Sequence, residues 1–250
     1  MILKRRFALL LLFLLTFLAL CFSCAKDGQA VAVSAPSQLR RCIALTFDDG
    51  PSPRCTPRLL DGLQELGARA TFFVVGKTDE TSKERYRQIV AAGHTLGMHS
   101  YSHDYKKIYQ SVESFLDDYY QLFTLLKEET GVKPSVFRFP GGSINSYNVG
   151  VYQEIIAEMV RRGFRFFDWS LSAEDAAKRS PSAAAICDGI LTRAEGRSRG
   201  IVLMHDSYHC KTTLEALPRL IDGLREKGYA LEPLDRSVTG ISFAYADCLD

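Results

Sequence analysis

Two short segments of the sequence bring carboxylates and imidazoles together at spacings that suit metal chemistry. Asp48 and Asp49 are adjacent, so their side chains point in different directions, and one can bind a metal while the other faces a substrate. His99 and His103 are four residues apart, a spacing that would place both imidazoles on one face of a helical turn. Asp49 and the two histidines make three protein ligands, the pattern of a catalytic zinc site or of another divalent ion such as cobalt.

Simpler structural interpretations exist for parts of this pattern. Residues 49–51, Asp-Gly-Pro, are a typical turn sequence when taken alone. His205 lies in a separate segment, and we expect it to act as a general acid that faces the metal from across the site. Its alternatives are an additional metal ligand or a hydrogen-bonded histidine of the core. We place neither His94 nor His209 in the site.

Predicted strands and helices, which must position these residues, alternate along the chain. Short apolar runs predict seven strands, at residues 42–47, 70–75, 94–98, 135–139, 164–169, 200–204 and 229–234. Longer segments with helical periodicity lie between them, and several end at a glycine, as helices commonly do. Strands joined by crossover helices form a parallel sheet that is covered on both sides. Both an open doubly wound sheet and a closed or distorted barrel satisfy this pattern.

The residues that could take part in metal binding or catalysis lie where the predicted strands end. They are Asp48 and Asp49 after the first strand, His99 and His103 after the third, Arg138 and Gly141 at the fourth, Asp168, Trp169 and Asp175 at the fifth, and His205 after the sixth. In a parallel α/β fold the carboxyl ends of the strands share one face, and that face carries the active site. The sequence therefore predicts a single site at that face.

Five motifs, in their order along the chain, resemble the polysaccharide deacetylase family, also called the NodB-homology family or carbohydrate esterase family four. They are TFDDGP (46–51), HSYSH (99–103), RFPGG (138–142), the stretch 169–175 and LMH (203–205). The resemblance spans residues 41 to 235, and TFDDGP together with HxxxH is highly specific. It implies an α/β fold, a distorted (β/α) barrel with about seven parallel strands. It also implies metal-dependent hydrolysis of N- or O-acetyl groups on sugar polymers.

The resemblance implies a role for each matching residue. Asp48 matches the catalytic base, Arg138 the arginine that pairs with the base, His205 the general acid, and Asp175 the carboxylate that orients the acid. Asp49, His99 and His103 match the metal ligands, with Zn²⁺ as the expected ion and Co²⁺ as the alternative. Gly141 matches the backbone N–H that binds the oxyanion, and Leu203 and Trp169 match the acetyl pocket.

The chain departs from the family pattern at two positions that bear on the substrate. Many relatives have an aromatic residue where this chain has Gly141, and a tryptophan where it has Ala176. With Gly142, these small residues predict a wide groove and a preference for polymers over monomeric sugars. The segments RFPGGS and DWSLSAEDA resemble a branch from Gram-positive bacteria. Peptidoglycan is therefore the expected substrate, and chitin-like polymers or xylan are the alternatives.

Two other classes of protein compete with the deacetylase. A glycoside hydrolase on a barrel needs two carboxyl groups on either side of the scissile bond, about 5–10 Å apart. The acids predicted at this site are instead assigned to a metal and a histidine. A non-catalytic barrel that binds wall polysaccharide would be expected to have lost Asp48 or His205, and the chain keeps both.

Composition and net charge exclude several classes of protein and argue against nucleic acid as a partner. Hydrophobic residues make up 46% and charged residues 24%, which excludes a disordered, collagen-like or many-span membrane protein. The 31 basic and 29 acidic residues give a net charge of +2. Lys4, Arg5 and Arg6 precede an apolar run, and without them the count is 28 basic against 29 acidic. A near-neutral domain lacks the basic patches that bind nucleic acid.

The N-terminal residues predict export from the cytoplasm. Residues 7–25 carry no charge and follow three basic residues, so residues 1–25 are expected to be a signal peptide or a signal anchor. Lipidation at Cys24 is a third alternative. Residues 26–40 lack large hydrophobes and are expected to be a linker, with the catalytic domain at 41–250. Because positive charge stays inside, the domain would be secreted or held at the outer face of the cytoplasmic membrane.

Cysteines in the domain are compatible with an oxidising compartment. Five lie beyond residue 40, and none forms a CxxC pair. Cys55 and Cys210 fall in loops that are both expected at the active-site face, so a disulfide between them is one of the pairings allowed outside the cytoplasm.

Overall fold

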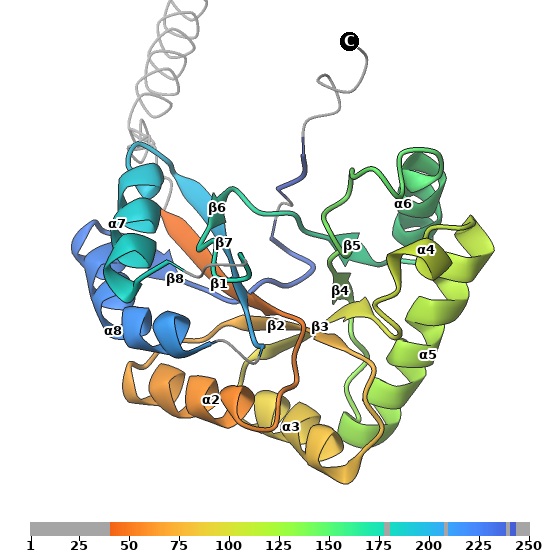
Figure 1. The fold of residues 1–250 in the computed structure, drawn as a ribbon, viewed down its shortest axis with the longest axis horizontal. Helices are drawn as coiled ribbons and strands as arrows, with labels where there is room; N and C mark the ends of the chain where they lie inside the picture. Colours follow the sequence, from red (N-terminus) through yellow and green to blue (C-terminus); the bar gives the residue numbers. More distant parts are fainter. Residues whose placement is uncertain (1–40, 178–180, 208–209, 239–240, 244–250) are drawn as a thin grey trace, which may run out of the picture. The chain divides into compact units, whose positions relative to one another are not determined.

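The structure, a computed structural model, describes residues 41–177, 181–207, 210–238 and 241–243 (Figure 1). Its central sheet has eight strands, and every pair is parallel. They are β1 (Cys42–Asp48), β2 (Thr71–Val75), β3 (Thr95–Ser100), β4 (Val136–Phe137), β5 (Arg165–Phe166), β6 (Leu171–Ser172), β7 (Arg199–His205) and β8 (Ala230–Leu231). Across the sheet the order is β5-β4-β3-β2-β1-β7-β6, and β8 pairs with the first residues of β1.

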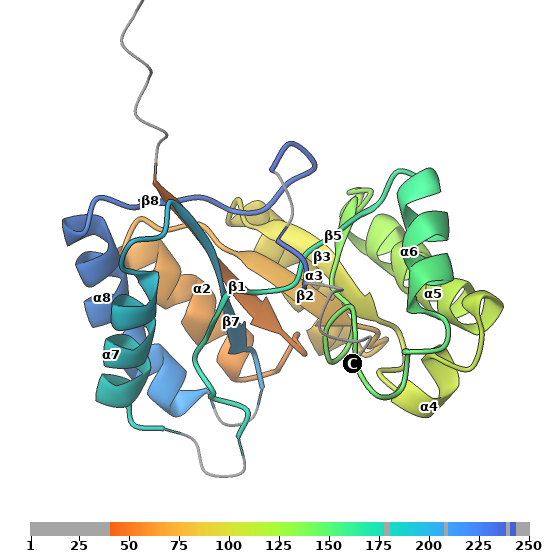
Figure 2. The same cartoon turned by 90° about the horizontal axis from the view of Figure 1, so that it is seen from above.

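In the described ranges, seven helices connect the strands and cover one face of the sheet (Figure 1). They are α2 (Cys55–Glu65), α3 (Glu80–Ala91), α4 (Tyr105–Ile108), α5 (Val112–Thr130), α6 (Tyr152–Arg161), α7 (Ala183–Ala194) and α8 (Lys211–Glu226). The longer helices pack side by side in the order α7, α8, α2, α3, α5, α6, as Figure 2 shows from above. Gly131 ends α5 with a φ of 71°, the left-handed conformation that favours glycine at this position.

Strand residues alternate between the two faces of the sheet, and this alternation selects the side chains that reach the site. Phe47 of β1 and Met204 of β7 belong to the large core beneath the helices. A smaller apolar cluster lies on the opposite, inner face, and its buried members are Ala44, Phe73, Val136, Phe167, Ile201 and Leu234. Because successive side chains point to opposite faces, Asp48 and His205 lie on the inner face as well.

The segment after β8 covers the inner face. Its Val238 and Ile241 pack against the inner apolar cluster. The backbone N–H of Leu234 donates to the hydroxyl of Thr71 at 2.8 Å, and the N–H of Asp168 donates to the carbonyl of Ile241 at 2.9 Å. The carboxyl-terminal residues therefore take the place of a second layer of helices on this side.

The predicted fold class, a distorted (β/α) barrel of parallel strands, is confirmed. In the described residues β5 and β6 do not pair, so the sheet curls without closing. The predicted seven strands are all present, and β6 is an eighth that was not predicted, because Leu171 stands between two serines and forms no apolar run. The one-turn helix α4 was not predicted either, because four residues are too few to show helical periodicity.

Two expectations concern the ends and the cysteines of the chain. The expected signal segment at 1–25 and linker at 26–40 lie outside the described residues. Within the described ranges, no helix has both the length and the apolar character needed to cross a bilayer. Cys55 and Cys210 form a disulfide, as the loop positions suggested, across a sequence separation of 155.

Candidate active site

The three predicted metal ligands meet at the carboxyl ends of β1 and β3. Oδ1 of Asp49 lies 3.5 Å from Nε2 of His99 and 3.3 Å from Nε2 of His103. One ligand atom from each of the three side chains lies within 4.8 Å of the others, close enough for a single metal ion. Among the described residues, this cluster includes Asp49 and not Asp48.

The two histidines do not lie on a helical turn, so the predicted shared helical face is wrong. β3 extends through His99 to Ser100, and the chain then bends. Ser100 and His103 have φ values of 138° and 53°, and Asp49 has a φ of 71°. Left-handed φ values are uncommon for residues other than glycine. The four-residue spacing is therefore closed by a tight irregular loop, which cannot be distinguished from a helical turn by spacing alone.

His99 is held in the form that binds a metal. Its Nδ1 lies 3.0 Å from the carbonyl oxygen of Arg138, which can only accept, so Nδ1 carries the hydrogen and Nε2 presents its lone pair. Burial lowers the pKa of His99 to about 3, against a smaller opposing effect of Asp49. The ring is therefore neutral at ordinary pH.

The donor set fits a divalent transition metal. Nε2 of His103 is buried and has no hydrogen-bond partner among the described residues, which is costly for a polar atom unless a ligand fills that direction. Two imidazole nitrogens with one carboxylate oxygen suit zinc or a neighbouring first-row ion better than magnesium or calcium, which prefer oxygen ligands only.

Asp48 lies beside the three ligands but is held by Arg138 instead. Nη1 of Arg138 donates to Oδ1 of Asp48 at 2.8 Å, while Oδ2 of Asp48 is 3.8 Å from Nε2 of His99. Burial raises the pKa of Asp48 above its ordinary value, and the nearby charge of Arg138 counteracts part of that rise. One carboxylate oxygen is thus fixed by the arginine, and the other faces the ligand cluster.

The guanidinium of Arg138 is fully buried, and other strand ends satisfy its remaining donors. Nη1 also donates to the hydroxyl of Thr46 at 2.7 Å. Nε donates to the carbonyl of Phe167 at 2.9 Å, and Nη2 to that of Asp168 at 3.2 Å. Arg138 therefore ties β1, β4 and the end of β5 together on the inner face.

Asp175 holds His205 across the site, at the ends of β6 and β7. Nδ1 of His205 lies 2.8 Å from Oδ1 of Asp175, and the hydroxyl of Thr213 donates to Oδ2 at 2.7 Å. Burial alone would lower the pKa of His205, but the hydrogen bond and charge of Asp175 outweigh it. The pKa is therefore above its ordinary 6.5. The residue thus keeps a proton to a higher pH than a free histidine.

The loop after β4 carries Gly141 and is anchored by Asp168. Gly141 has a φ of 78°, and within the described ranges its N–H donates to no other group. Asp168 accepts from the N–H of Ser143 at 2.8 Å and from the N–H of Phe243 at 2.8 Å. Its carboxylate therefore fixes the loop to the carboxyl-terminal segment.

The remaining predicted pocket residues border the same region. Leu203 is two residues before His205 in β7, so both side chains point to the inner face. Trp169 packs beside the inner apolar cluster, and its ring lies over the guanidinium of Arg138 at 5.7 Å. All ten residues predicted from the sequence thus lie at one end of the sheet.

Two aromatic residues at the site were missed. A Cβ atom built on Gly141 would lie 2.8 Å from the ring of Tyr105, and one built on Gly142 would overlap the ring of Phe243. The expectation that these glycines leave a wide groove is therefore wrong, because rings from α4 and the carboxyl-terminal segment occupy the space. Tyr105 follows the HxxxH motif by two residues, and that closeness was the only available signal.

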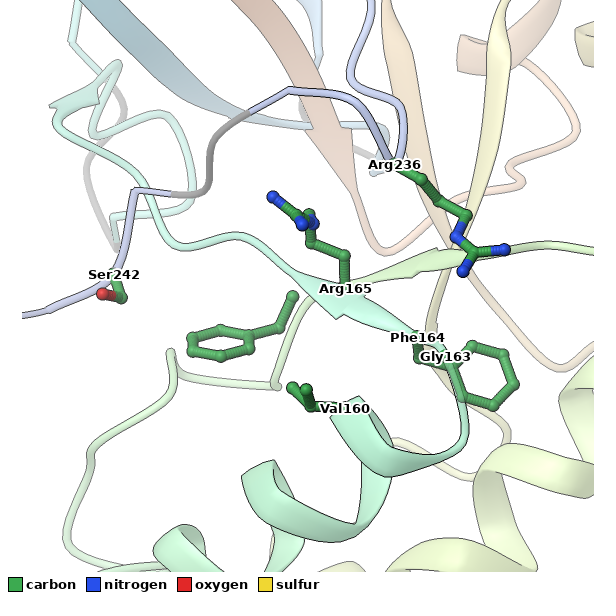
Figure 3. Close-up of a pocket in the computed structure, with 7 residues that line it drawn as sticks. Val160, Gly163, Phe164, Arg165, Arg236 and Ser242 are labelled. Atoms are coloured by element: carbon green, nitrogen blue, oxygen red, sulfur yellow. The ribbon is translucent and has the colours of Figure 1, made fainter.

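A separate pocket of about 360 Å³ lies at the edge of the sheet, by β5. Figure 3 shows Arg165 and Arg236 beside Val160 and two phenylalanine rings. None of the ten predicted site residues lines this pocket. We therefore do not assign it to the candidate site.

Known proteins that are similar to this chain belong to one family. The profile of a family described as polysaccharide deacetylase matches residues 36–160. A peptidoglycan-N-acetylglucosamine deacetylase of Bacillus cereus is 32% identical over 207 residues, which are 80% of this chain and 72% of that protein. A bifunctional xylanase/deacetylase of Pseudobutyrivibrio xylanivorans is 34% identical over 197 residues, 77% of this chain and 30% of that protein.

A solved structure gives the same result for the fold. The catalytic domain of a peptidoglycan N-acetylglucosamine deacetylase from Eubacterium rectale superposes with a TM-score of 0.77 at 30% identity. The match covers 86% of this chain and 98% of that domain.

Proposed function

The chain belongs to the polysaccharide deacetylase family, and on this basis we propose that it hydrolyses the N-acetyl groups of peptidoglycan amino sugars in a metal-dependent reaction. Water and the amide are consumed, and acetate and a free sugar amine are formed. The observation that carries the proposal is the position of Asp48. Its free oxygen faces the Asp49–His99–His103 cluster, while Arg138 holds the other oxygen at 2.8 Å.

Asp49, His99 and His103 would hold the metal, zinc in the first place and cobalt as the alternative. When bound, such an ion supplies Lewis acidity that polarises an acetyl carbonyl and favours ionisation of water. Burial keeps His99 neutral, and the carbonyl of Arg138 fixes the tautomer that leaves Nε2 free for a metal, which supports this assignment.

We assign Asp48 as the general base. Its free oxygen can accept the proton of the attacking water, and Arg138 keeps the carboxylate fixed in orientation during that transfer. The backbone carbonyls of Phe167 and Asp168 hold the guanidinium of Arg138 in place, so the Asp48 carboxylate bound to it is held in place as well. The pair therefore works as a rigid unit, which suits proton transfer at a defined distance.

The backbone N–H of Gly141 would stabilise the tetrahedral oxyanion. Its lack of a hydrogen-bond partner among the described residues supports this role, since an exposed donor on a fixed loop is ready for developing negative charge. Asp168 keeps the loop in place through Ser143. Leu203 and Trp169 would bound the acetyl methyl group on the apolar side of the site.

His205 would donate a proton to the departing amine. Asp175 orients the ring through Nδ1, so that Nε2 can face the substrate, and also favours the protonated form. The acid and the base thus come from the neighbouring strands β7 and β1, where His205 and Asp48 are register partners. Asp175 acts only through His205 and is a positioning residue.

Two features support peptidoglycan over other acetylated polymers. One similar protein is named for peptidoglycan N-acetylglucosamine, and the similar solved domain has the same substrate in its name. The similarity to a xylanase/deacetylase supports xylan as the alternative, and chitin-like polymers are a third. We expect polymers to be preferred to monomers, because distant sugar contacts supply binding energy that an acetyl group cannot.

The decisive experiment measures acetate released from peptidoglycan, acetylated chitin oligomers and acetylated xylan, with and without a chelator. We expect release from peptidoglycan that stops on chelation and returns when zinc is added. Release that persists after complete metal removal would exclude the metal-dependent mechanism. Cleavage of the glycan chain without acetate would favour a glycoside hydrolase, and binding without any product would favour a non-catalytic barrel.

We further propose that the domain acts outside the cytoplasm, either secreted or held at the outer face of the membrane by residues 1–25. The basic residues Lys4, Arg5 and Arg6 before an uncharged run support this orientation. Protease added to intact protoplasts should digest the domain. Complete protection of the domain would argue against export.

A further inference from the structure

The loop that joins the candidate metal ligands His99 and His103 is bound to a carboxylate from a different element. Asp118 lies in the middle of α5 and is only 3% exposed. Its Oδ1 accepts from the hydroxyl of Ser100 at 2.7 Å and from the N–H of Tyr101 at 2.6 Å. Its Oδ2 accepts from the N–H of Ser102 at 2.9 Å. One side chain thus satisfies three consecutive residues of the loop.

The same contacts continue to His103. The N–H of His103 donates to the hydroxyl oxygen of Ser100 at 2.9 Å, and that hydroxyl donates in turn to Asp118. Ser100 and His103 both have positive φ values, at 138° and 53°, which residues of these types rarely adopt unaided. The hydrogen bonds to Asp118 therefore hold the loop in a conformation that its sequence does not favour.

We propose that Asp118 is the positioning residue of the metal site, which sets the place of His103 relative to His99 and Asp49. The inference rests on the proposed metal-dependent function. Asp118 touches none of the three ligand atoms and acts through the loop backbone and the Ser100 hydroxyl. His99 has its own support, because its Nδ1 contacts the carbonyl of Arg138. His103 depends on the loop for its position.

A carboxylate is the side chain that this arrangement requires. All three partners of Asp118 are donors, and an ionised carboxylate offers two oxygens that both accept. An asparagine would turn an NH₂ group toward one of these donors, whichever way the amide is oriented. At least one buried N–H or hydroxyl would then lose its acceptor, and the loop would relax away from its positive φ values.

Asp117 provides a matched control, because it is the same residue type, one position earlier on the same helix, and exposed. We would compare Asp118→Asn with Asp117→Asn in the full chain. The measurement is the zinc affinity of the purified protein, from competition with a chromophoric chelator. Thermal unfolding of the metal-free proteins, measured in parallel, reports on the fold alone.

We expect Asp118→Asn to weaken zinc binding by about 10–100-fold, the usual effect of losing a group that orients a metal ligand. Asp117→Asn should bind zinc as the wild type does. Equal zinc affinity of the two variants would overturn the inference. A loss of thermal stability in Asp118→Asn without a loss of affinity would do the same, since it would reduce Asp118 to a purely structural role.

Ser100→Ala keeps the test decisive if Asp118→Asn does not fold. It removes only the hydroxyl between Asp118 and His103 and leaves both backbone contacts of the carboxylate. Weaker zinc binding by a folded Ser100→Ala protein would support the inference, and unchanged binding would overturn it. A wild-type chain that binds no zinc would contradict the proposed metal dependence itself, whereas zinc binding without acetate release would contradict only the proposed reaction.

Discussion

The carboxylate of Asp175 holds His205 at two points. Oδ1 contacts Nδ1 of the ring at 2.8 Å, and Oδ2 accepts from the backbone N–H of the same residue at 3.0 Å. Ring orientation and chain position are thereby set by one side chain. Such a double contact leaves the imidazole little freedom to turn away from the inner face.

The pH dependence of the reaction should follow from this contact. The pKa of His205 is raised above 6.5, so the acid form persists to a higher pH and activity falls only as the pH rises through that raised value. Asp175→Asn removes the charge that favours the imidazolium and should move the alkaline limb of kcat/KM to lower pH. Glu174→Gln, at the exposed neighbouring position, should leave the limb in place. An unshifted limb in Asp175→Asn would assign the general acid elsewhere.

Variants of Asp48 and Asp49 should differ in the amount of metal that they bind. Asp49→Ala removes a ligand, so both bound zinc and activity should be lost. Asp48→Asn keeps the three ligands, and acetate release should fall by at least the 10²–10⁴-fold that general base catalysis is typically worth. Metal analysis of both purified variants beside acetate release decides the matter. Loss of zinc in Asp48→Asn with retention in Asp49→Ala would reverse the two assignments.

Gly141→Ala should impair turnover without removing the metal. The residue has a φ of 78°, and its new Cβ would lie 2.8 Å from the ring of Tyr105, which in turn packs edge-on against His103. The loop N–H would then be displaced, so kcat should fall while zinc content stays normal. Gly150→Ala is the control, because nothing lies within 4 Å of its Cβ position. Wild-type kcat in Gly141→Ala would remove this loop from the mechanism.

The disulfide between Cys55 and Cys210 should increase the free energy of unfolding measurably. It joins the first turn of α2 to the residue before α8, across a separation of 155 residues, and so restricts the unfolded chain strongly. The double variant Cys55→Ser/Cys210→Ser should lose on the order of 2–4 kcal/mol in the free energy of unfolding by urea. Reductant should destabilise the wild type and leave the double variant unchanged. Equal effects of reductant on both would point to another thiol.

Motif residues could be placed from the sequence because the fold does most of the positioning. Asp48, His99, Arg138 and His205 lie at or just after the ends of parallel strands, so knowing the strands was enough to bring the residues together. The alternation of apolar and polar residues carried a second signal. Phe47 and Met204 face the helices, which sends the residue after each of them to the inner face.

Other features of the site could not be predicted, because they arise from contacts between distant parts of the chain. Asp118 looks like any polar residue of an amphipathic helix, and only the fold brings it to the loop of His103. Phe243 approaches Trp169 from the carboxyl-terminal segment, with ring centres 4.9 Å apart. The prediction of a helical turn between His99 and His103 failed for a local reason, because a four-residue spacing is compatible with more than one backbone conformation.

The hydrogen bond from Phe243 to Asp168 has a consequence for the timing of biosynthesis. Asp168 anchors the Gly141 loop through Ser143, yet one of its partners is made about a hundred residues after that loop. A nascent chain that lacks residues 241–243 has the predicted base, acid and metal ligands but not the full anchor of the Gly141 loop. The loop would therefore gain its last anchor only once Phe243 has been added, about a hundred residues after the loop itself.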